Sequence, residues 1–400
     1  MTNKTNQQPY SVYIIAGEPS GDFIGAQLIS KLKQLNPNLT VKGVGGELME
    51  QQGIRSLFNI RHIAIMGLTE VIPKLGIILK LVKKTVEDIK KTQPDVLITI
   101  DSPGFNKKVA SQIKKCCPNI KLIHYVAPSV WAYKPKRAKK FARIFDYLYC
   151  LLPFEPKYFI PLGLPAYFVG HPIVEKFVNS QNSSVVDDNH RLSDNKNLVL
   201  LPGSRVKEVT NLLPLFLIVA DKLRQEGIAK RVFLPTVHYL LPLVRSICKP
   251  YPFVEISDIP DRKYQYMFQS DLALAASGTV TLELALARVK TVVAYKFNFI
   301  TICVIATLIK TRFVTLINIL ANKEIYPELL GPKCTIKKLY TTSKKTLEQP
   351  LDKEALMSSL YKLGYGKFCP SAKAADLTLK ILSGQTPKLS DPEDNLSELD

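Results

Sequence analysis

The sequence has no cysteine arrangement that would indicate a metal or redox site. Its seven cysteines include no CxxC pair, and no group of cysteine and histidine stands at a spacing typical of zinc ligands. Disulfide frameworks belong mainly to small exported domains. We therefore interpret the cysteines as reduced thiols in a cytoplasmic protein.

Apolar stretches long enough to span a membrane are absent too. The first ten residues are polar and lack the apolar core of a signal peptide, so we do not expect export. Charged residues and a proline interrupt 63–82, and the apolar stretch 297–309 has only thirteen residues. We expect a soluble protein, or one that lies on a membrane without crossing it.

Acidic residues are scarce relative to basic ones. The chain has 34 Asp and Glu against 54 Lys and Arg, which gives a formal charge of +20. This excess predicts an anionic partner: a nucleic acid, a phosphorylated substrate or the anionic face of a membrane. Because there is no RNP signature and no basic motif interleaved with aromatic residues, nucleic acid is the least favoured of the three.

What the chain does contain indicates two globular domains. Four hundred residues are too many for one hydrophobic core, and 46% of them are hydrophobic. Each half repeats strand, glycine turn and helix, which predicts the α/β class with a doubly wound parallel sheet in each domain. The polar stretch 179–197 marks the boundary. Ligand-type loops at strand ends in both halves predict a cleft between the domains.

The stretch 95–106, DVLITIDSPGFN, contains the candidate on which the functional interpretation depends. Its apolar run 96–100 predicts a strand buried on both faces. Asp101 then stands at the carboxyl end of that strand, where open α/β sheets bind ligands. From the residues alone, two interpretations stay open. Asp101 is either an acid that meets a substrate, or it caps a helix expected from about 107 or closes an Asx-turn.

Glycine turns follow other predicted strands. After the strand 11–16, the loop GEPSGD contains Gly17 and Gly21, which would let the backbone approach a ligand at a helix N-terminus. The spacing is neither a Walker loop nor a dinucleotide fingerprint, so this loop alone is weak evidence for a site.

The second half shows the same pattern. Arg205 follows a strand and a glycine turn, where its guanidinium can hold a diphosphate. After a later strand, Gly278 and Thr279 offer backbone N–H groups to phosphate oxygens, and Glu283 can accept hydrogen bonds from a ribose. The alternative for Glu283 is an acid that complements the helix dipole.

Two basic segments each have a structural and a functional interpretation. Residues 60–91 combine lysines with an apolar helix side that consists of Leu75, Ile78, Leu79, Val82 and Val86. This segment is either a helix packed on the sheet with a solvated basic edge, or a docking site for a membrane or an acyl chain. The segment 134–143 has six basic residues, which either meet phosphates or form a solvated helix face.

A series of motifs resembles the lipid-A-disaccharide synthase family. In chain order they are AGEPSGD (16–22), GVGG (43–46), MGLTEV (66–71), IDSPGFN (100–106), YVAPSVWAY (125–133), VGHP (169–172), LPGSR (201–205), SGTVTLE (277–283) and TLINILANKEIYPELL (315–330). The resemblance covers about 12–382, and the order and spacing of these independent motifs make it specific.

The resemblance implies a GT-B glycosyltransferase with two doubly wound Rossmann-like domains facing a cleft, and no metal or other cofactor. It implies transfer of 2,3-diacylglucosamine from its UDP derivative to the 6-hydroxyl of 2,3-diacylglucosamine 1-phosphate, which yields the β-1,6 disaccharide 1-phosphate and UDP. An α-linked donor and a β-linked product mean inversion, so one direct displacement needs a base on the acceptor and stabilisation of the departing UDP.

The resemblance also implies roles for individual residues. Asp101 matches the acid regarded as catalytic and becomes the first choice for the general base. Donor binding is implied for six residues: Arg205, Gly278, Thr279, Glu283, Asn318 and Glu324. Glu18 and Ser20 belong to a glycine loop that faces the cleft in this architecture. The chain departs from the family at Gly331, where relatives often have Gln, and at Ile317, where Pro is common.

Together, these observations predict a division of the chain. The expected parts are an acceptor-side domain (10–172), a helix and polar linker (173–197), a UDP-sugar-binding domain (198–350), C-terminal helices that return to the first domain (351–382) and a disordered tail (383–400). Because both implied substrates carry acyl chains, we expect a peripheral protein on the cytoplasmic face of the inner membrane, bound to anionic lipid. A homo-oligomer is left open.

Two other functions stay open. The first is another UDP-N-acetylglucosamine-using GT-B enzyme, either a lipid-linked transferase or a 2-epimerase. Such enzymes would share the second-domain loop but would not be expected to contain both IDSPGFN and AGEPSGD. The second is a non-catalytic protein that binds a nucleotide sugar or membrane lipid.

Overall fold

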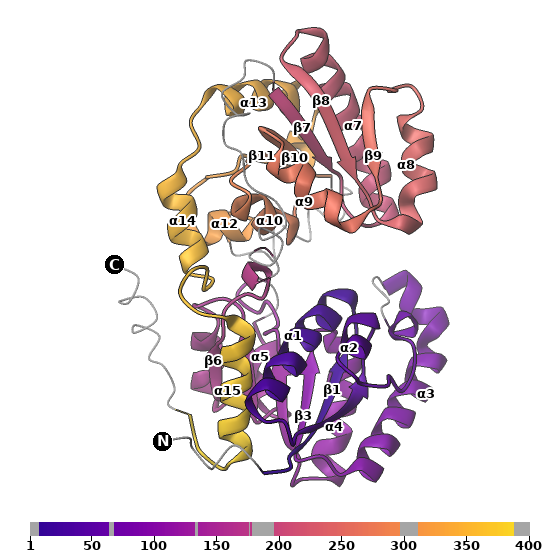
Figure 1. Cartoon of the computed structure of the whole chain (residues 1–400), viewed down its shortest axis with the longest axis vertical. Helices are drawn as coiled ribbons and strands as arrows, with labels where there is room; N and C mark the ends of the chain where they lie inside the picture. Colours follow the sequence, from indigo (N-terminus) through magenta and orange to yellow (C-terminus); the bar gives the residue numbers. More distant parts are fainter. Residues whose placement is uncertain are drawn as a thin grey trace. The chain divides into compact units, whose positions relative to one another are not determined.

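The computed structural model describes residues 8–63, 68–132, 135–175, 177, 196–296 and 311–387. The chain divides into two compact units (Figure 1). The first unit comprises residues 1–172 and 363–400, and the second comprises residues 173–362. Most of the predicted polar linker, residues 178–195, lies outside the described residues.

The first unit alternates strands and helices. Its main elements are β1 (Ser11–Ala16), α1 (Pro19–Leu35), β2 (Thr40–Val44), α2 (Glu47–Gln51), α3 (Leu68–Thr92), β3 (Val96–Ile100), α4 (Pro103–Cys116), β4 (Lys121–Tyr125), α5 (Arg137–Ala142), β5 (Tyr147–Cys150), β6 (Ala166–Phe168) and α15 (Pro370–Leu382). The strands form one parallel sheet in the order β2-β1-β3-β4-β5-β6.

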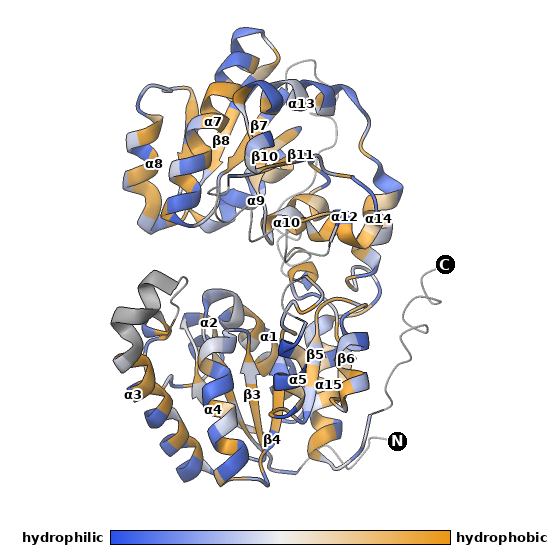
Figure 2. Cartoon of the chain, turned by 180° about the vertical axis from the view of Figure 1, so that it is seen from behind, coloured by the Kyte–Doolittle hydropathy of each residue, from blue (hydrophilic) through white to orange (hydrophobic). Residues whose placement is uncertain are grey.

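This sheet is covered on both faces. All five residues of β3 are buried, and Figure 2 shows this strand as hydrophobic along its length. Alternate residues of β1 enter opposite cores: Tyr13 packs among side chains of α3 and α4, whereas Val12 packs among those of α1 and α15. The strand predicted at 96–100 and the doubly wound sheet of this unit are therefore confirmed.

The second unit has the same alternation. Its main elements are β7 (Lys196–Leu201), α7 (Val206–Gln225), β8 (Ala229–Pro235), η6 (His238–Leu240), α8 (Leu241–Cys248), β9 (Val254–Ser257), α9 (Pro260–Phe268), β10 (Leu272–Ala276), α10 (Val280–Leu286), β11 (Lys290–Tyr295), α12 (Leu316–Ala321), β12 (Glu328–Leu330), α13 (Ile336–Glu348) and α14 (Lys353–Tyr361). The strands again form one parallel sheet, in the order β12-β11-β10-β7-β8-β9.

Each sheet contains one point where the strand order changes direction. In the first unit the chain leaves β1 toward β2 and later returns to β3 on the other side of β1. In the second unit β7 leads toward β8 and β9, and the chain then returns to β10 on the other side of β7. The helices after such a pair of strands lie on opposite faces, which opens a crevice at the carboxyl ends of the strands. These two switch points are where ligand sites are expected.

Two element boundaries differ from the sequence prediction. Helix α4 begins at Pro103 rather than near 107, because Pro at the first helical position suits the fixed φ of its ring. The sequence from Ile120 predicts a strand to Ala127, but β4 ends at Tyr125, because Val126 adopts a φ of 79°, in the left-handed region. A β-branched residue with positive φ is unusual and marks a strained turn at this strand end.

The C-terminal helices belong to different units. Helix α15 packs against α1 in the first unit, and Figure 1 shows the two side by side. Helix α14 packs against α12 in the second unit, so the expected return of the whole range 351–382 is wrong for its first part. The carbonyl of Pro387, in the expected tail, accepts a hydrogen bond of 3.1 Å from the Tyr167 hydroxyl, whereas residues 388–400 lie outside the described residues.

Helix α3 buries a narrower side than the sequence predicts. Val82 and Val86 are buried as expected, and Ile78 packs against the same core. Leu79, expected on the apolar side, is instead 50% exposed, as is Ile77. Among the described helices, none is long and apolar enough to cross a membrane.

Asp22 connects α1 to α2 through backbone groups. Its carboxylate accepts hydrogen bonds from the N–H groups of Gly46 (2.7 Å), Leu48 (3.0 Å) and Met49 (3.1 Å). Asp22 is 5% exposed, so these bonds form away from bulk water. The first N–H groups of a helix have no acceptor within the helix, and Asp22 provides that acceptor for α2.

Asp22→Ala should lower the free energy of unfolding of the first unit by about 2 kcal/mol, because it leaves buried N–H groups without an acceptor. The free energy of unfolding can be measured by urea unfolding followed by the fluorescence of Trp131. This is the only tryptophan of the sequence and lies in the first unit. Glu50→Ala, at an exposed position in α2, is the matched control and should change stability by about 0.5 kcal/mol or less. Equal stability of Asp22→Ala and the control would contradict the assigned role.

Candidate active site

The loops at the first switch point touch through Gly17. Ala16 of β1 pairs with Ile100 of β3, so the loops that follow these strands begin side by side. A Cβ added at Gly17 would lie 2.4 Å from both Cβ and Oγ of Ser102, closer than real atoms approach. Position 17 therefore requires glycine, and the close approach brings the first glycine loop against the Asp101 turn.

The turn after β3 has an unusual backbone. Asp101 and Ser102 both lie in the left-handed region, with φ of 49° and 43°. Left-handed residues other than glycine are uncommon and concentrate at functional sites. The backbone N–H of Asp101 donates to the carbonyl of Tyr125 at 3.0 Å, which fixes the turn to the neighbouring strand end. Because Ser102 is the N-cap residue of α4, Asp101 does not cap this helix.

The carboxylate of Asp101 has the environment of a base. It is half-buried and accepts a hydrogen bond from the Ser102 backbone N–H. Burial raises the pKa of Asp101 above its ordinary value because it disfavours the charged form, and the hydrogen bond from Ser102 opposes this with a smaller effect. A raised pKa makes the carboxylate a better proton acceptor.

Asn106 holds the backbone on which Asp101 stands. Its side-chain amide donates to the carbonyls of Ile100 at 3.0 Å and of Asp101 at 2.7 Å. Asn106 is fully buried, so both bonds form without competing water. The sequence shows Asn106 within IDSPGFN, but the helical turn that brings its amide back to the strand end is visible only in the structure.

Glu18 and Ser20 are the residues predicted in the first glycine loop. Glu18 stands at the N-cap position of α1 and is half-buried, and Ser20 is exposed in the first turn of this helix. Both belong to the loop that contacts the Asp101 turn. Asp22 is used by α2 and has a structural role.

The second switch point brings the two predicted donor loops together. Leu201 of β7 pairs with Ala275 of β10, so the loops containing Arg205 and Gly278 begin on neighbouring strands. Gly278 and Thr279 are exposed at the start of α10, and no described atom lies within 4 Å of a Cβ added at Gly278. This loop leaves its backbone accessible to a ligand.

The carboxylate of Glu208 lies in the turn that contains Arg205. Glu208, three residues into α7, accepts hydrogen bonds from the backbone N–H groups of Ser204 (3.1 Å) and Arg205 (3.3 Å). Its other oxygen lies 3.2 Å from the Arg205 guanidinium. Gly203, with a φ of 112°, leaves room for this carboxylate. The Tyr239 hydroxyl also donates to the carbonyl of Ser204. The turn therefore already holds one anionic group, which is the chemistry expected of a phosphate-binding loop.

Glu283 is buried within hydrogen-bonded partners. It is 4% exposed, accepts a bond of 2.8 Å from the Tyr264 hydroxyl and forms an ion pair with Lys263. Burial and the neighbouring Glu283 carboxylate raise the pKa of the Tyr264 hydroxyl, which therefore stays protonated and donates. A ribose diol would have to share these carboxylate oxygens with Lys263 and Tyr264.

The side-chain amide of Asn318 makes all of its hydrogen bonds within the chain. Its N–H groups donate to the carbonyl of Tyr326 (2.8 Å) and to Glu328 (2.9 Å). Its oxygen accepts from the N–H groups of Ile325 (2.9 Å) and Tyr326 (3.0 Å). An amide side chain offers two donors and two acceptor positions, so all four are used within the chain. Asn318 therefore shapes the loop that contains Glu324, an exposed residue.

The positions that depart from the family fit their surroundings. Gly331 adopts a φ of 55°, which glycine adopts without strain. Ile317 is fully buried in the first turn of α12. Glu328 accepts hydrogen bonds from the backbone N–H groups of Val314 (2.9 Å) and Thr315 (2.9 Å), which stabilises the start of α12.

Sequence reasoning missed several residues that shape these sites. They are Asn106, Glu208, Tyr239, Lys263, Tyr264 and Glu328. For Glu208 a signal existed, because an acid at the third helical position often accepts N–H groups at the N-cap. The others come from distant elements. Within the described ranges, no group of three or more His, Cys, Asp or Glu side chains is placed to hold a metal ion.

A family model described as lipid-A-disaccharide synthetase matches residues 12–371, a range that contains all of the candidate residues. The chain belongs to the lipid-A-disaccharide synthase family. The motif resemblance is thereby confirmed, and this family member is a glycosyltransferase.

Curated relatives extend over nearly the whole chain. The chain is 37% identical over 395 residues to the lipid-A-disaccharide synthase of Rhodospirillum centenum, covering 95% of this chain and 98% of that protein. It is 40% identical over 389 residues to the lipid-A-disaccharide synthase of Rickettsia felis, covering 92% and 95%.

Solved structures with the same fold are more distant in sequence. The S. aureus MnaA–UDP complex is 13% identical with a TM-score of 0.66, covering 96% of this chain and 99% of that one. The glycosyltransferase of kitacinnamycin is 13% identical with a TM-score of 0.60, covering 94% and 100%. The predicted α/β fold of GT-B type, with two parallel sheets, is confirmed for this family member.

The family motif YVAPSVWAY is attached to the sheet by a buried acid. The Trp131 indole N–H donates to Glu155 at 3.2 Å, and the other Glu155 oxygen accepts from the backbone N–H groups of Leu151 (3.0 Å) and Leu152 (3.1 Å). Glu155 is 3% exposed. Burial raises the pKa of Glu155 to about 7, against the opposing effect of these hydrogen bonds.

Because the folded-state pKa of Glu155 is above its unfolded value near 4.5, the stability it contributes is complete below pH 4.5 and is lost as pH rises through about 7. We predict that Trp131 fluorescence of the folded protein titrates with one proton near pH 7. Glu155→Gln should abolish this titration and flatten the decrease in stability, whereas Glu87→Gln, on the exposed side of α3, should preserve both. A titration that persists in Glu155→Gln would show that another group is responsible.

Proposed function

We propose that this family member transfers 2,3-diacylglucosamine from UDP-2,3-diacylglucosamine to the 6-hydroxyl of 2,3-diacylglucosamine 1-phosphate. The products are the β-1,6 lipid A disaccharide 1-phosphate and UDP. The observation that carries this proposal is Asp101, a carboxylate of raised pKa in a strained turn at the first switch point, within a chain of the lipid-A-disaccharide synthase family.

Asp101 acts as the general base. It accepts the proton of the acceptor hydroxyl as the oxygen attacks the anomeric carbon of the donor, and the bond to UDP breaks in the same displacement. Its raised pKa supports this role, because a base of higher pKa drives proton transfer further at neutral pH. Asn106 holds the Asp101 backbone, and Glu18 and Ser20 lie on the adjoining loop, so they belong to the acceptor side.

The second unit binds the donor. The Arg205 guanidinium and the backbone N–H groups of Gly278 and Thr279 receive the diphosphate, which carries the negative charge that develops as UDP departs. Glu208 keeps Arg205 in position. When the donor binds, some of the guanidinium N–H groups donate hydrogen bonds to its diphosphate. Glu283 receives the ribose diol together with Tyr264.

We assign Asn318 a role in holding the conformation of the donor-side loop, and no direct contact with the donor. Because its amide is fully used within the chain, we assign it to holding the loop of Glu324, which is exposed and can reach the donor. This refines the expectation of direct donor contact at position 318.

We further propose that the protein works at the cytoplasmic face of the inner membrane. Both substrates carry acyl chains, and a net charge of +20 favours an anionic lipid surface. Helix α3 exposes Ile77 and Leu79, each 50% exposed, beside Lys80 and Lys83. Apolar side chains flanked by lysines suit the boundary between headgroups and acyl chains.

A second function is favoured by one observation, the shared fold of a Neisseria meningitidis UDP-GlcNAc 2-epimerase bound to UDP-GlcNAc, at 10% identity and a TM-score of 0.62. An epimerase of this kind would convert UDP-N-acetylglucosamine alone and would not need an acylated acceptor.

The test is to incubate the purified protein with both acylated substrates and measure UDP release and disaccharide mass. Wild type should form the disaccharide, and Asp101→Asn should lose about a hundredfold or more in turnover. Asp95→Asn is the matched control, because Asp95 stands at the opposite end of β3, where its carboxylate accepts the Ser11 N–H at 2.7 Å. It should keep turnover within about twofold, as expected away from the site.

Absence of disaccharide with wild type would overturn the proposed substrates, and conversion of UDP-N-acetylglucosamine alone would favour the epimerase. Disaccharide formed equally by wild type and Asp101→Asn would keep the reaction and remove Asp101 as its base.

A further inference from the structure

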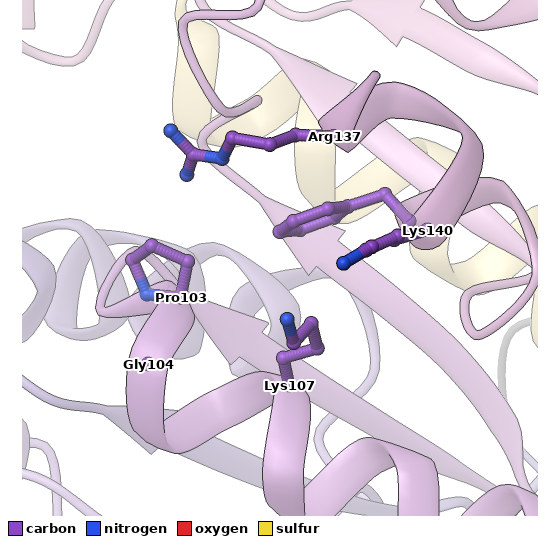
Figure 3. Close-up of a pocket in the computed structure, with 6 residues that line it drawn as sticks. Pro103, Gly104, Lys107, Arg137 and Lys140 are labelled. Carbon is purple, nitrogen blue, oxygen red and sulfur yellow. The ribbon is translucent and has the colours of Figure 1, made fainter. Parts of the chain in front are cut away.

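A pocket with three cationic side chains lies beside the Asp101 turn, within the first unit. Its volume is about 190 Å³, and its lining residues are Pro103, Gly104, Lys107, Arg137, Lys140 and Phe141. The first three come from the start of α4 and the others from α5. Figure 3 shows the charged ends of Lys107, Arg137 and Lys140 directed toward the same space, from the two helices.

The charges of this pocket are not balanced by acids. Among the described residues no acid lines it, and none of the three cationic side chains has an ion pair or side-chain hydrogen bond with another described residue. Elsewhere on α4 the pattern differs, because Lys114 pairs with Asp146. Three like charges directed at one space repel one another unless an anion joins them. The missing counter-charge therefore points to an anionic ligand.

Two further features favour an anion here. Pro103 and Phe141 form apolar walls beside the cations, and electrostatic attraction is stronger beside apolar protein surface than in bulk water. The pocket also includes the first residues of α4, a helix of fourteen residues whose positive dipole end lies there. Gly104 is exposed, and no described atom would contact a Cβ added to it.

The position of the pocket indicates which anion it receives. Pro103 follows Asp101 by two residues, so the pocket begins close to the proposed base along the chain. In the proposed acceptor, the 6-hydroxyl and the 1-phosphate stand at opposite ends of one hexose ring. A ligand with its hydroxyl at Asp101 therefore has its phosphate about one sugar away.

We propose that the pocket formed by Lys107, Arg137 and Lys140 binds the phosphate of the acceptor and so directs the acceptor's 6-hydroxyl to Asp101. This inference rests on the proposed function and adds to it a site for the acceptor's charged group. A phospholipid headgroup or free phosphate offers related chemistry, and the position beside Asp101 favours the phosphomonoester of the acceptor.

The test compares two acceptors, 2,3-diacylglucosamine with and without its 1-phosphate, in micelles of a non-ionic detergent. Lys107→Gln and Arg137→Gln should each raise KM for the phosphorylated acceptor about tenfold or more, because each removes a charged hydrogen bond. Their KM for the UDP-sugar should stay within about twofold of wild type, and their kcat with the phosphorylated acceptor should fall, because its 6-hydroxyl is less well placed at Asp101. With the dephosphorylated acceptor, wild type and variants should have the same KM.

Lys139→Gln is the matched control, because Lys139 is exposed on α5 and does not line the pocket. It should behave as wild type with both acceptors. Inorganic phosphate should compete with the phosphorylated acceptor in wild type and lose this inhibition in Lys107→Gln. An equal change in KM for both acceptors in the Lys107 and Arg137 variants would overturn the proposal.

Two more outcomes are decisive. If the variants keep wild-type KM for the phosphorylated acceptor but no longer sediment with vesicles containing phosphatidylglycerol, the pocket holds a membrane headgroup and the proposal fails. If wild type forms no disaccharide, the proposed function fails. The pocket is then tested by measuring how tightly the protein binds micelles that contain the phosphorylated acceptor. Equal binding by wild type and Lys107→Gln would overturn the proposal.

Discussion

The reversal of strand order in each parallel sheet is the constraint on which the proposed chemistry depends. In the first unit it places the loops after β1 and β3 side by side, and the absence of a side chain at Gly17 lets them touch through Ser102. In the second unit it places the loops after β7 and β10 together, which brings Arg205 near the Gly278 turn. Strands buried on both faces leave these carboxyl ends as the place where polar groups meet a ligand.

Hydrogen-bond partners then decide what each polar side chain can do. Asp22 receives three backbone N–H groups and Glu328 receives two, so both acids stabilise the ends of helices. Asn318 uses its whole amide within one loop. For the Asp101 carboxylate, the Ser102 backbone supplies a single hydrogen bond that does not offset burial, so its pKa is raised. Similar functional groups thus have different chemistry because their surroundings differ.

The sequence predicts the sheets and the loops because both depend on local patterns. Runs of apolar or β-branched residues such as 96–100 predict buried strands, and glycine turns such as the one at Gly278 predict accessible backbone. Tertiary contacts decide the rest. The positive φ of Val126 ends β4 early, and the packing of α14 on α12 keeps that helix in the second unit.

The candidate residues follow the same division. Asp101 could be predicted because a strand end and a motif coincide there. The occupation of the Arg205 turn by Glu208, the partners of Glu283 and the cationic pocket could not, because each joins elements that are separate in sequence. Helical spacing predicts Leu79 on the apolar side of α3, but the spacing does not show how much of that side the sheet covers, and Leu79 is 50% exposed.

The most direct test of the account is the pH dependence of kcat/KM for the acceptor at saturating UDP-sugar. If Asp101 removes the proton, activity should fall with a slope of one as pH drops through the pKa of this carboxyl in the complex with the UDP-sugar. Because burial raises that pKa, the midpoint should lie above the ordinary aspartate value of about 3.9. A profile that stays flat down to that value, or an acid limb that is unchanged in the residual activity of Asp101→Asn, would contradict the account.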